Sequence, residues 1–177
     1  MKKEIKKLQK FVKPFYENKD NMHNLFHINR ILNLALKLSK NYKVDKQLMI
    51  YGAYLHGINH HNPKEVLQFL KSQKFDDIRI KHVLLVTEES HKETKPETIE
   101  GTILHDANLL EGGKTFIIVK TLIVGVERKR SLEDTIKYLE KDIFGKYKCY
   151  LPEAQKIFLE KERYARDFIK ELKKGLK

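Results

Sequence analysis

Apolar residues recur every three or four positions along almost the whole chain, and this spacing is the feature that most constrains the fold. Only four prolines and eight glycines interrupt the 177 residues, so the breaks that strands and tight turns require are few. The spacing predicts an all-α fold of about eight or nine helices without internal repeats. The expected helices cover residues 3–17, 22–41, 45–57, 63–73, 76–90, 97–110, 114–129, 131–145 and 152–175.

Local signals support several of these boundaries. Pro63 and Pro96 each stand at an expected first helical position, where proline is tolerated. The four residues from Ser131, "SLED", resemble a capping box. Segment 116–126 is rich in β-branched residues and is typical of a strand as well as a helix. We expect a helix, because a strand there would find no partner elsewhere in the chain.

The size and composition of the chain are those of one globular domain. Residues 1–177 can build a single core, and the hydrophobic share of 41% is well above that of a disordered chain. No stretch approaches the length of a membrane span. The one cysteine, Cys149, fits a reducing compartment. We therefore expect a cytoplasmic protein without a membrane segment.

The net charge of +12 raises the question of nucleic-acid binding. Thirty of the 36 basic residues are lysines, however, and they are spread over every segment. Proteins that read bases rely on arginine instead. The pattern therefore argues against specific nucleic-acid binding and favours a lysine-rich solvated surface, which is compatible with a phosphorylated small molecule as ligand.

Three polar residues fall on apolar helix faces. His27 lies within the apolar face of helix 22–41, with His23 at its edge, and His56 ends a helix that is apolar on most sides. Asp106 occupies the core-facing stripe of helix 97–110. A histidine so placed is usually satisfied by a backbone carbonyl, but a buried carboxylate needs a cation or several hydrogen-bond donors. Imidazole and carboxylate together are metal-binding chemistry, although spacing alone does not bring them together.

The same residues carry a resemblance to a known family. "HNLFHINRI" (residues 23–31), "LHG" (55–57) and "DANLLEGG" (106–113) follow one another in the order and at the separations typical of small HD-domain phosphohydrolases. In that family the corresponding motifs are H-D-x-x-H-x-x-R, the H-D doublet and D-A-D-x-L. The chain therefore resembles the HD-domain superfamily over about residues 15–145, and we expect the C-terminal helix to pack on this part.

The resemblance implies one divalent metal ion (Zn, Mn, Ni, Fe or Mg) held by His27, His56, position 57 and Asp106. Such an ion lowers the pKa of a bound water and neutralises charge on phosphoryl oxygens. Three departures all remove negative charge. Gly57 replaces the aspartate of the doublet, Asn24 stands where the opening motif has aspartate, and Asn108 replaces the second aspartate of D-A-D. The remaining ligands favour Zn²⁺ or a similar ion over Mg²⁺.

Neighbouring polar residues are candidates to complete such a site. His60 and His61 follow the helix that ends near Gly57, and Glu88, Glu89 and His91 close helix 76–90. These residues are candidates for ligands, for proton transfer or for an ordinary polar helix end.

Specific roles follow from the resemblance. We expect a catalytic role for His60, Glu89 and His91. His23, Arg30 and Lys114 are the candidates for binding substrate, with Lys120 as a further phosphate-binding candidate.

Two functions remain in view from the sequence. The first is a metal-dependent phosphohydrolase acting on a phosphomonoester or phosphodiester, a nucleotide among the candidates. The second is a catalytically silent HD-fold protein that binds a nucleotide, nucleic acid or protein without turnover. The two retained histidines and Asp106 favour the enzyme, and the lost carboxylates favour the binding protein. Assembly into homo-oligomers stays open.

Overall fold

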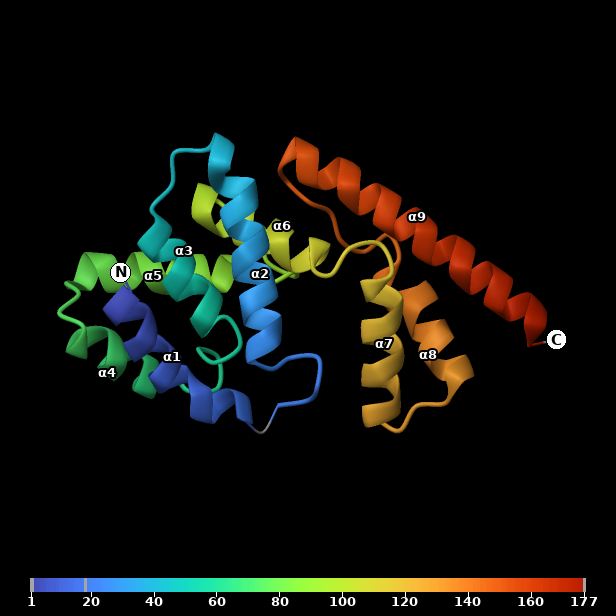
Figure 1. Ribbon diagram of the computed structural model, residues 1–177, viewed down its shortest axis with the longest axis horizontal. Helices are drawn as coiled ribbons and strands as arrows, with labels where there is room; N and C mark the ends of the chain where they lie inside the picture. Colours follow the sequence, from blue (N-terminus) through green and yellow to red (C-terminus); the bar gives the residue numbers. More distant parts are fainter. Residues whose placement is uncertain (1, 18, 177) are drawn as a thin grey trace.

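The computed structural model describes residues 2–17 and 19–176, and these residues form nine α-helices with one 3₁₀ turn, one π-helical turn and no strand (Figure 1). The all-α prediction is confirmed, and the β-branched segment after residue 115 is helical. The elements are α1 (Lys2–Glu17), α2 (Leu25–Leu38), η1 (Ser39–Asn41), α3 (Lys46–Leu55), α4 (Pro63–Ser72), α5 (Asp77–Glu89), α6 (Ile99–Leu110), α7 (Phe116–Glu127), α8 (Leu132–Tyr138), η2 (Leu139–Ile143) and α9 (Pro152–Gly175).

Two helices begin later than expected because side chains cap them. The Asn24 side chain accepts a hydrogen bond from Phe26 N at 2.9 Å, so α2 begins after Asn24. The Thr98 side chain accepts from Gly101 N at 3.0 Å, so α6 begins after Thr98. Pro96 therefore precedes this helix, and its predicted place at the first helical position is wrong.

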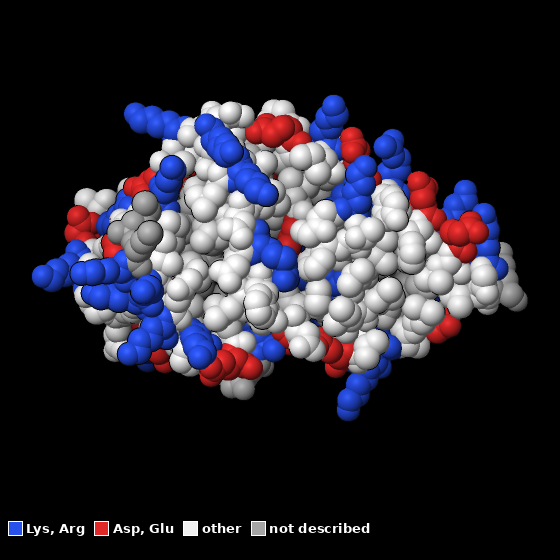
Figure 2. Space-filling view, in the orientation of Figure 1, with Lys and Arg blue, Asp and Glu red and all other residues white. Residues whose placement is uncertain are grey.

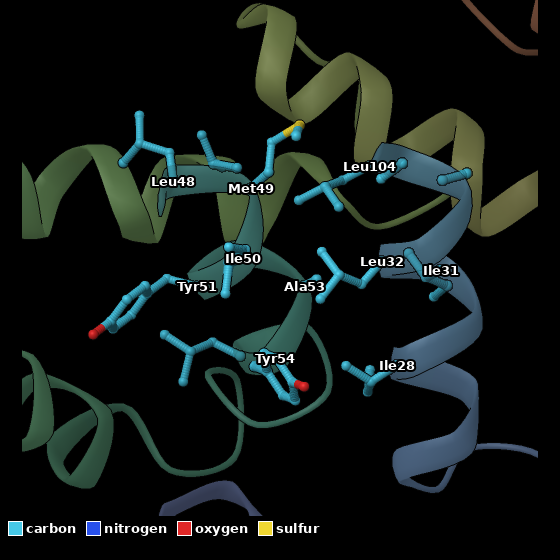
Figure 3. Packing of buried hydrophobic residues seen from close by; sticks show 14 of the residues in the cluster. Ile28, Ile31, Leu32, Leu48, Met49, Ile50, Tyr51, Ala53, Tyr54 and Leu104 are labelled. Atoms are coloured by element: carbon cyan, nitrogen blue, oxygen red, sulfur yellow. The ribbon is translucent and has the colours of Figure 1, made fainter. Parts of the chain in front are cut away.

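The core is built around α3, which packs against α1, α2, α5 and α6. Residues 48–55 of α3 are all buried, and Figure 3 shows Met49, Ala53 and Tyr54 among side chains from α2 and α6. Gly52 permits this close packing, because a Cβ atom there would lie 2.8 Å from a side-chain carbon of Val86 on α5. Each fully buried leucine or isoleucine contributes roughly 1.5–3 kcal/mol to stability.

A second, smaller hydrophobic cluster lies between α7, α8, η2 and α9. In Figure 1 these elements stand to the right of α1–α6, and α9 runs along the upper right edge. Ala154 and Phe158 of α9 belong to the main cluster, while Ala165 and Ile169 belong to the second. The C-terminal helix thus packs on α6 and α7 and joins the two clusters.

The outer surface is basic. Figure 2 shows lysine and arginine side chains spread over the visible face, most densely at the left, where α1 lies. Among the described helices none has the length and apolar character needed to cross a lipid bilayer.

Candidate functional site

Five imidazole rings form a row between the start of α2 and the end of α5. Ring centroids are separated by 5.6 Å from His23 to His27 and by 5.9 Å from His27 to His56. The row continues over 4.3 Å from His56 to His91 and 5.0 Å from His91 to His60. The fold therefore gathers histidines from segments that are far apart in the sequence, as the helix faces suggested for His27 and His56.

His27 is buried against a carboxylate that the sequence did not single out. Its Nδ1 lies 2.9 Å from Oε2 of Glu111, at the end of α6. Arg30 Nε donates to Glu111 Oε1 at 2.7 Å, and Lys120 Nζ donates to Oε2 at 3.1 Å. Burial, only partly offset by Glu111, lowers the pKa of His27 to about 4. Burial by itself would raise the pKa of Glu111. The contacts with His27 and Lys120 outweigh burial and lower this pKa to about 2. His27 is thus neutral at pH 7, beside an ionised carboxylate.

The protonation of His56 follows from its partner. Its Nδ1 lies 2.6 Å from Ser90 Oγ, and this hydroxyl donates its single proton to Thr87 O at 2.5 Å. The Nδ1 of His56 must therefore donate, which leaves its Nε2 lone pair free. Burial lowers the pKa of His56 well below its ordinary value. Nδ1 of His27 faces Glu111 at 2.9 Å without the alignment of a hydrogen bond, and within the described residues Nε2 of neither ring takes part in a hydrogen bond. We call these two residues the inner pair.

Asp106 is fully buried, but it serves the C-terminal helix and not the inner pair. Its oxygens accept hydrogen bonds from Tyr150 N at 2.9 and 3.0 Å and from Leu151 N at 2.7 Å, just before α9 begins at Pro152. His105 Nδ1 lies 3.0 Å from Oδ1. The carboxylate has the donors that its burial requires, as predicted, but they are backbone N–H groups. The structure does not group Asp106 with the inner pair into a set of three close ligand atoms within the described residues.

A lysine takes the place in which the resemblance implies a carboxylate. Lys19 Nζ donates a hydrogen bond to Gly57 O, directly after His56. A Cβ atom at Gly57 would lie 2.5 Å from this nitrogen. A positive charge therefore occupies the space of the missing ligand. Lys19 lies in the loop before the first motif and belongs to none of the motifs.

The four-ligand metal site of the resembled family does not fit these residues. Gly57 offers no side chain, and Asp106 is committed to α9. Asn24 caps α2 through its side chain. Asn108 Nδ2 donates to Ser90 O at 3.3 Å and carries no charge. Two imidazoles remain of the implied set.

A cavity of about 180 Å³ lies next to the inner pair, and both His23 and Glu111 line it. Its wall contains more cations than carboxylates. The basic and aromatic lining residues are Lys92, Lys120, Lys161, Arg128, Phe116, Tyr138, Phe144, Tyr147 and Phe158. Such a wall suits an anionic group attached to an apolar or aromatic body.

His60, Glu88 and His91 form a separate group at the other end of the row. One ligand atom from each lies within 4.8 Å of the others. His60 Nε2 is 3.1 Å from Glu88 Oε2, and both side chains are exposed, at 57% and 44%. We call these three residues the outer cluster. His60 and His91, predicted as catalytic, thus lie together, and Glu88 joins them.

The other predicted site residues have different surroundings. Glu89, predicted as catalytic, is engaged elsewhere, because its carboxylate accepts from Glu97 N at 2.8 Å and Thr98 N at 3.1 Å in the segment just before α6. Lys114 pairs with Glu160 at 3.4 Å and is not among the described residues that line the cavity.

Of the two remaining substrate-binding candidates, one lies on the cavity wall. Arg30 is engaged by Glu111. His23 lines the cavity, with its Nδ1 at 2.7 Å from Asp20 Oδ1.

No protein-family model and no curated protein matches this chain, but several solved structures do. An HD-superfamily hydrolase from Bacillus thuringiensis is 21% identical with a TM-score of 0.76, over 99% of this chain and 97% of that one. The Lin1889 protein of Listeria innocua is 19% identical with a TM-score of 0.75, over 99% and 96%. Bacillus subtilis YpgQ in complex with ADP is 15% identical with a TM-score of 0.74, over 97% of each chain. The chain therefore shares the all-α fold of an HD-superfamily hydrolase.

Proposed function

We propose that this protein binds a phosphorylated small molecule in the cavity beside the inner pair and lacks the metal-dependent hydrolysis typical of the fold. The observation that carries this proposal is the position of Lys19. Its ammonium group binds the carbonyl of Gly57 and fills the space of a ligand carboxylate. A cation placed there repels a metal ion and so disfavours metal-dependent hydrolysis at the inner pair.

The charges around the cavity support an anionic ligand. Lys120, Lys161, Lys92 and Arg128 line it, against the carboxylates of Glu111 and Glu162. Arg30 and Lys120 already neutralise Glu111, and Arg166 pairs with Glu162. The wall thus carries an excess of positive charge, which phosphate oxygens satisfy through charge-assisted hydrogen bonds.

The size of the cavity favours a compact bound group. Its volume of about 180 Å³ is below the roughly 300–1,000 Å³ typical of pockets that enclose a whole drug-sized ligand. A phosphate with part of its organic body fits such a space, and a larger ligand would extend out of it. The structurally similar protein YpgQ forms a complex with ADP. Nucleotides are therefore among the compounds to be tested for binding.

A second candidate function is phosphoester hydrolysis, and one observation favours it. The inner pair presents two neutral imidazoles with free Nε2 atoms, which is the form that binds a metal ion or accepts a proton. In this case a metal ion, if bound there, would supply an activated water. His56 and His27 would then be required for turnover.

Titration calorimetry combined with a phosphate-release assay separates the two functions. The metal-free chain is titrated with phosphate, sugar phosphates and nucleoside phosphates, and each compound is then incubated with the chain plus Mn²⁺, Zn²⁺, Ni²⁺ or Mg²⁺. We expect saturable binding of at least one compound and no release of inorganic phosphate. Metal-dependent release that is lost in His56→Asn would instead establish the hydrolase.

Variants of lysine and arginine locate the binding site. We expect Lys92→Met and Arg128→Met to weaken binding about tenfold or more, since a hydrogen bond to a charged group contributes roughly 1.5–3 kcal/mol. Lys114→Met is the matched control, because Lys114 is exposed and pairs with Glu160. An equal loss in the control variant would show that only the overall basic charge matters and would contradict a site in the cavity.

A further inference from the structure

We propose that the outer cluster of His60, Glu88 and His91 binds one transition-metal ion of the Zn²⁺, Co²⁺ or Ni²⁺ type. This site is distinct from the inner pair and shares no residue with it. It does not depend on what the cavity binds.

The geometry of the outer cluster is close to that of a metal site. With ligands about 2.0–2.2 Å from a tetrahedral zinc ion, neighbouring ligand atoms lie about 3.3 Å apart. The His60 Nε2 to Glu88 Oε2 distance is 3.1 Å. The ligand atoms of all three residues lie within 4.8 Å of one another. A shift of about 1–2 Å in exposed side chains closes the set around an ion.

A buried nitrogen atom of His91 also supports a metal ion at the outer cluster. Nε2 of His91 is buried and has no hydrogen-bond partner within residues 2–17 and 19–176. A buried polar atom without a partner costs about 1–3 kcal/mol. The His91 ring lies between His56 at 4.3 Å and His60 at 5.0 Å. A bound ion or its water would satisfy a nitrogen that the protein leaves unpaired.

The donor set selects the kind of ion. Two imidazoles and one carboxylate suit Zn²⁺, Co²⁺ or Ni²⁺, whereas Mg²⁺ prefers oxygen ligands. The same combination of ligands leaves one coordination position to water in zinc enzymes. The partial exposure of His60 and Glu88 gives a hydrated ion direct access.

Metal binding at the outer cluster would link two segments of the chain. His60 belongs to the turn that follows α3, while Glu88 ends α5 and His91 follows it. The turn also carries Gly57 with its bound Lys19. An ion held here would restrain the turn after α3 against the end of α5. The ion would therefore stabilise the structure whether or not it takes part in a reaction.

Cobalt absorption tests the proposal directly. The chain, produced without a histidine tag and freed of metal by chelation, is titrated with Co²⁺ while the visible d–d bands are recorded. We expect one Co²⁺ per chain, displaced by Zn²⁺ and not by Mg²⁺. His60→Ala and Glu88→Gln should each weaken binding by at least about tenfold.

Matched controls come from the same segments. His61→Ala removes the neighbouring exposed histidine, and Glu93→Gln removes a nearby exposed carboxylate; both should bind Co²⁺ as the unmodified chain does. Circular dichroism checks that every variant folds. Absence of stoichiometric Co²⁺, unchanged binding in His60→Ala, or an equal loss in His61→Ala would each overturn the proposal.

Discussion

The inner pair and the outer cluster are neighbours in one row of histidines, but their surroundings are opposite. His27 and His56 are desolvated, and both lysines near them, Lys19 and Lys120, lower the pKa of His56 further. The outer cluster is half-exposed and includes its own carboxylate, Glu88. The carboxylate beside the inner pair, Glu111, is already engaged by Arg30 and Lys120, whereas Glu88 of the outer cluster faces His60.

This contrast shows that histidine content alone does not make a metal site. Electrostatic balance decides whether a divalent ion is stable, because two neutral imidazoles leave its charge uncompensated. At the inner pair the nearby carboxylate of Glu111 is neutralised by Arg30 and Lys120, and Lys19 adds a further positive charge beside Gly57. At the outer cluster one carboxylate remains within reach of the imidazoles. Four predictions test this difference, from the largest expected effect to the smallest.

Asp106→Ala should cause the largest loss of stability. Removal of the carboxylate leaves Tyr150 N and Leu151 N without their acceptor in the interior. We expect the free energy of unfolding to fall by about 3–5 kcal/mol, measured by urea denaturation. Asp167→Ala, an exposed change on α9, is the control and should have little effect. If Asp106→Ala kept full stability but lost metal, Asp106 would belong to the inner pair after all.

The stability of the protein should fall on acidification because His27 is held neutral. Its folded pKa of about 4 lies below the ordinary 6.5, so the unfolded chain binds the proton more strongly between these pH values. The contribution of His27 to stability is complete above pH 6.5 and is lost as the pH falls towards 4, which amounts to about 3 kcal/mol. Glu111, with its lowered pKa of about 2, adds a loss in the same direction below pH 4.5.

His27→Gln tests the origin of this pH dependence. Thermal unfolding between pH 7 and pH 4 should show a shallower slope in this variant, whatever its absolute stability. His82→Gln, a change at an exposed histidine on α5, should keep the original slope. An unchanged slope in His27→Gln would place the titrating group elsewhere.

Restoring a carboxylate at position 57 should create metal affinity only when Lys19 is also removed. In Gly57→Asp alone, we expect the new carboxylate to pair with Lys19 and Co²⁺ binding to stay as it was. Lys19→Met combined with Gly57→Asp should raise the affinity about tenfold, or about 1.4 kcal/mol. Both are measured in the His60→Ala background, which silences the outer cluster. A gain in Gly57→Asp alone would mean that Lys19 does not block the site.

Asn24→Ala should have the smallest effect. It removes the cap of α2, the helix that carries His27, and a lost N-cap costs about 1 kcal/mol. Asn24→Asp keeps the cap and should keep the stability. Neither change should alter metal binding, as followed by Co²⁺ absorption. A gain in affinity for Asn24→Asp would show that position 24 contributes to a metal site.

Much of the fold could be predicted because it depends on local signals. Helical spacing gave nine segments whose ends agree with the observed helices within a few residues, and Ser131 caps α8 by accepting from Asp134 N at 3.0 Å. Two helix starts moved because Asn24 and Thr98 cap α2 and α6, and the apolar pattern does not encode these hydrogen bonds. The site was harder, because its contacts join residues far apart in the chain.

Position on a helix face showed correctly that His27 and Asp106 are buried. It could not show their partners. A buried carboxylate needs a partner because of its own charge. Whether a metal ion or the backbone N–H groups before α9 supply that partner depends on how the helices pack. Glu111, inside the third motif, and Lys19, in the loop before the first motif, were missed for the same reason, because their partners come from other elements.

The sequence by itself determined the all-α architecture, the burial of His27 and Asp106, and the uncharged residues at positions 24, 57 and 108, because these depend on periodicity and residue type. The tertiary structure alone decided that Asp106 binds the backbone just before α9, that Lys19 fills the space beside Gly57, and that His60, Glu88 and His91 meet. These contacts join different elements, and the packing of helices around α3 brings them within the few ångströms over which charges and hydrogen bonds act.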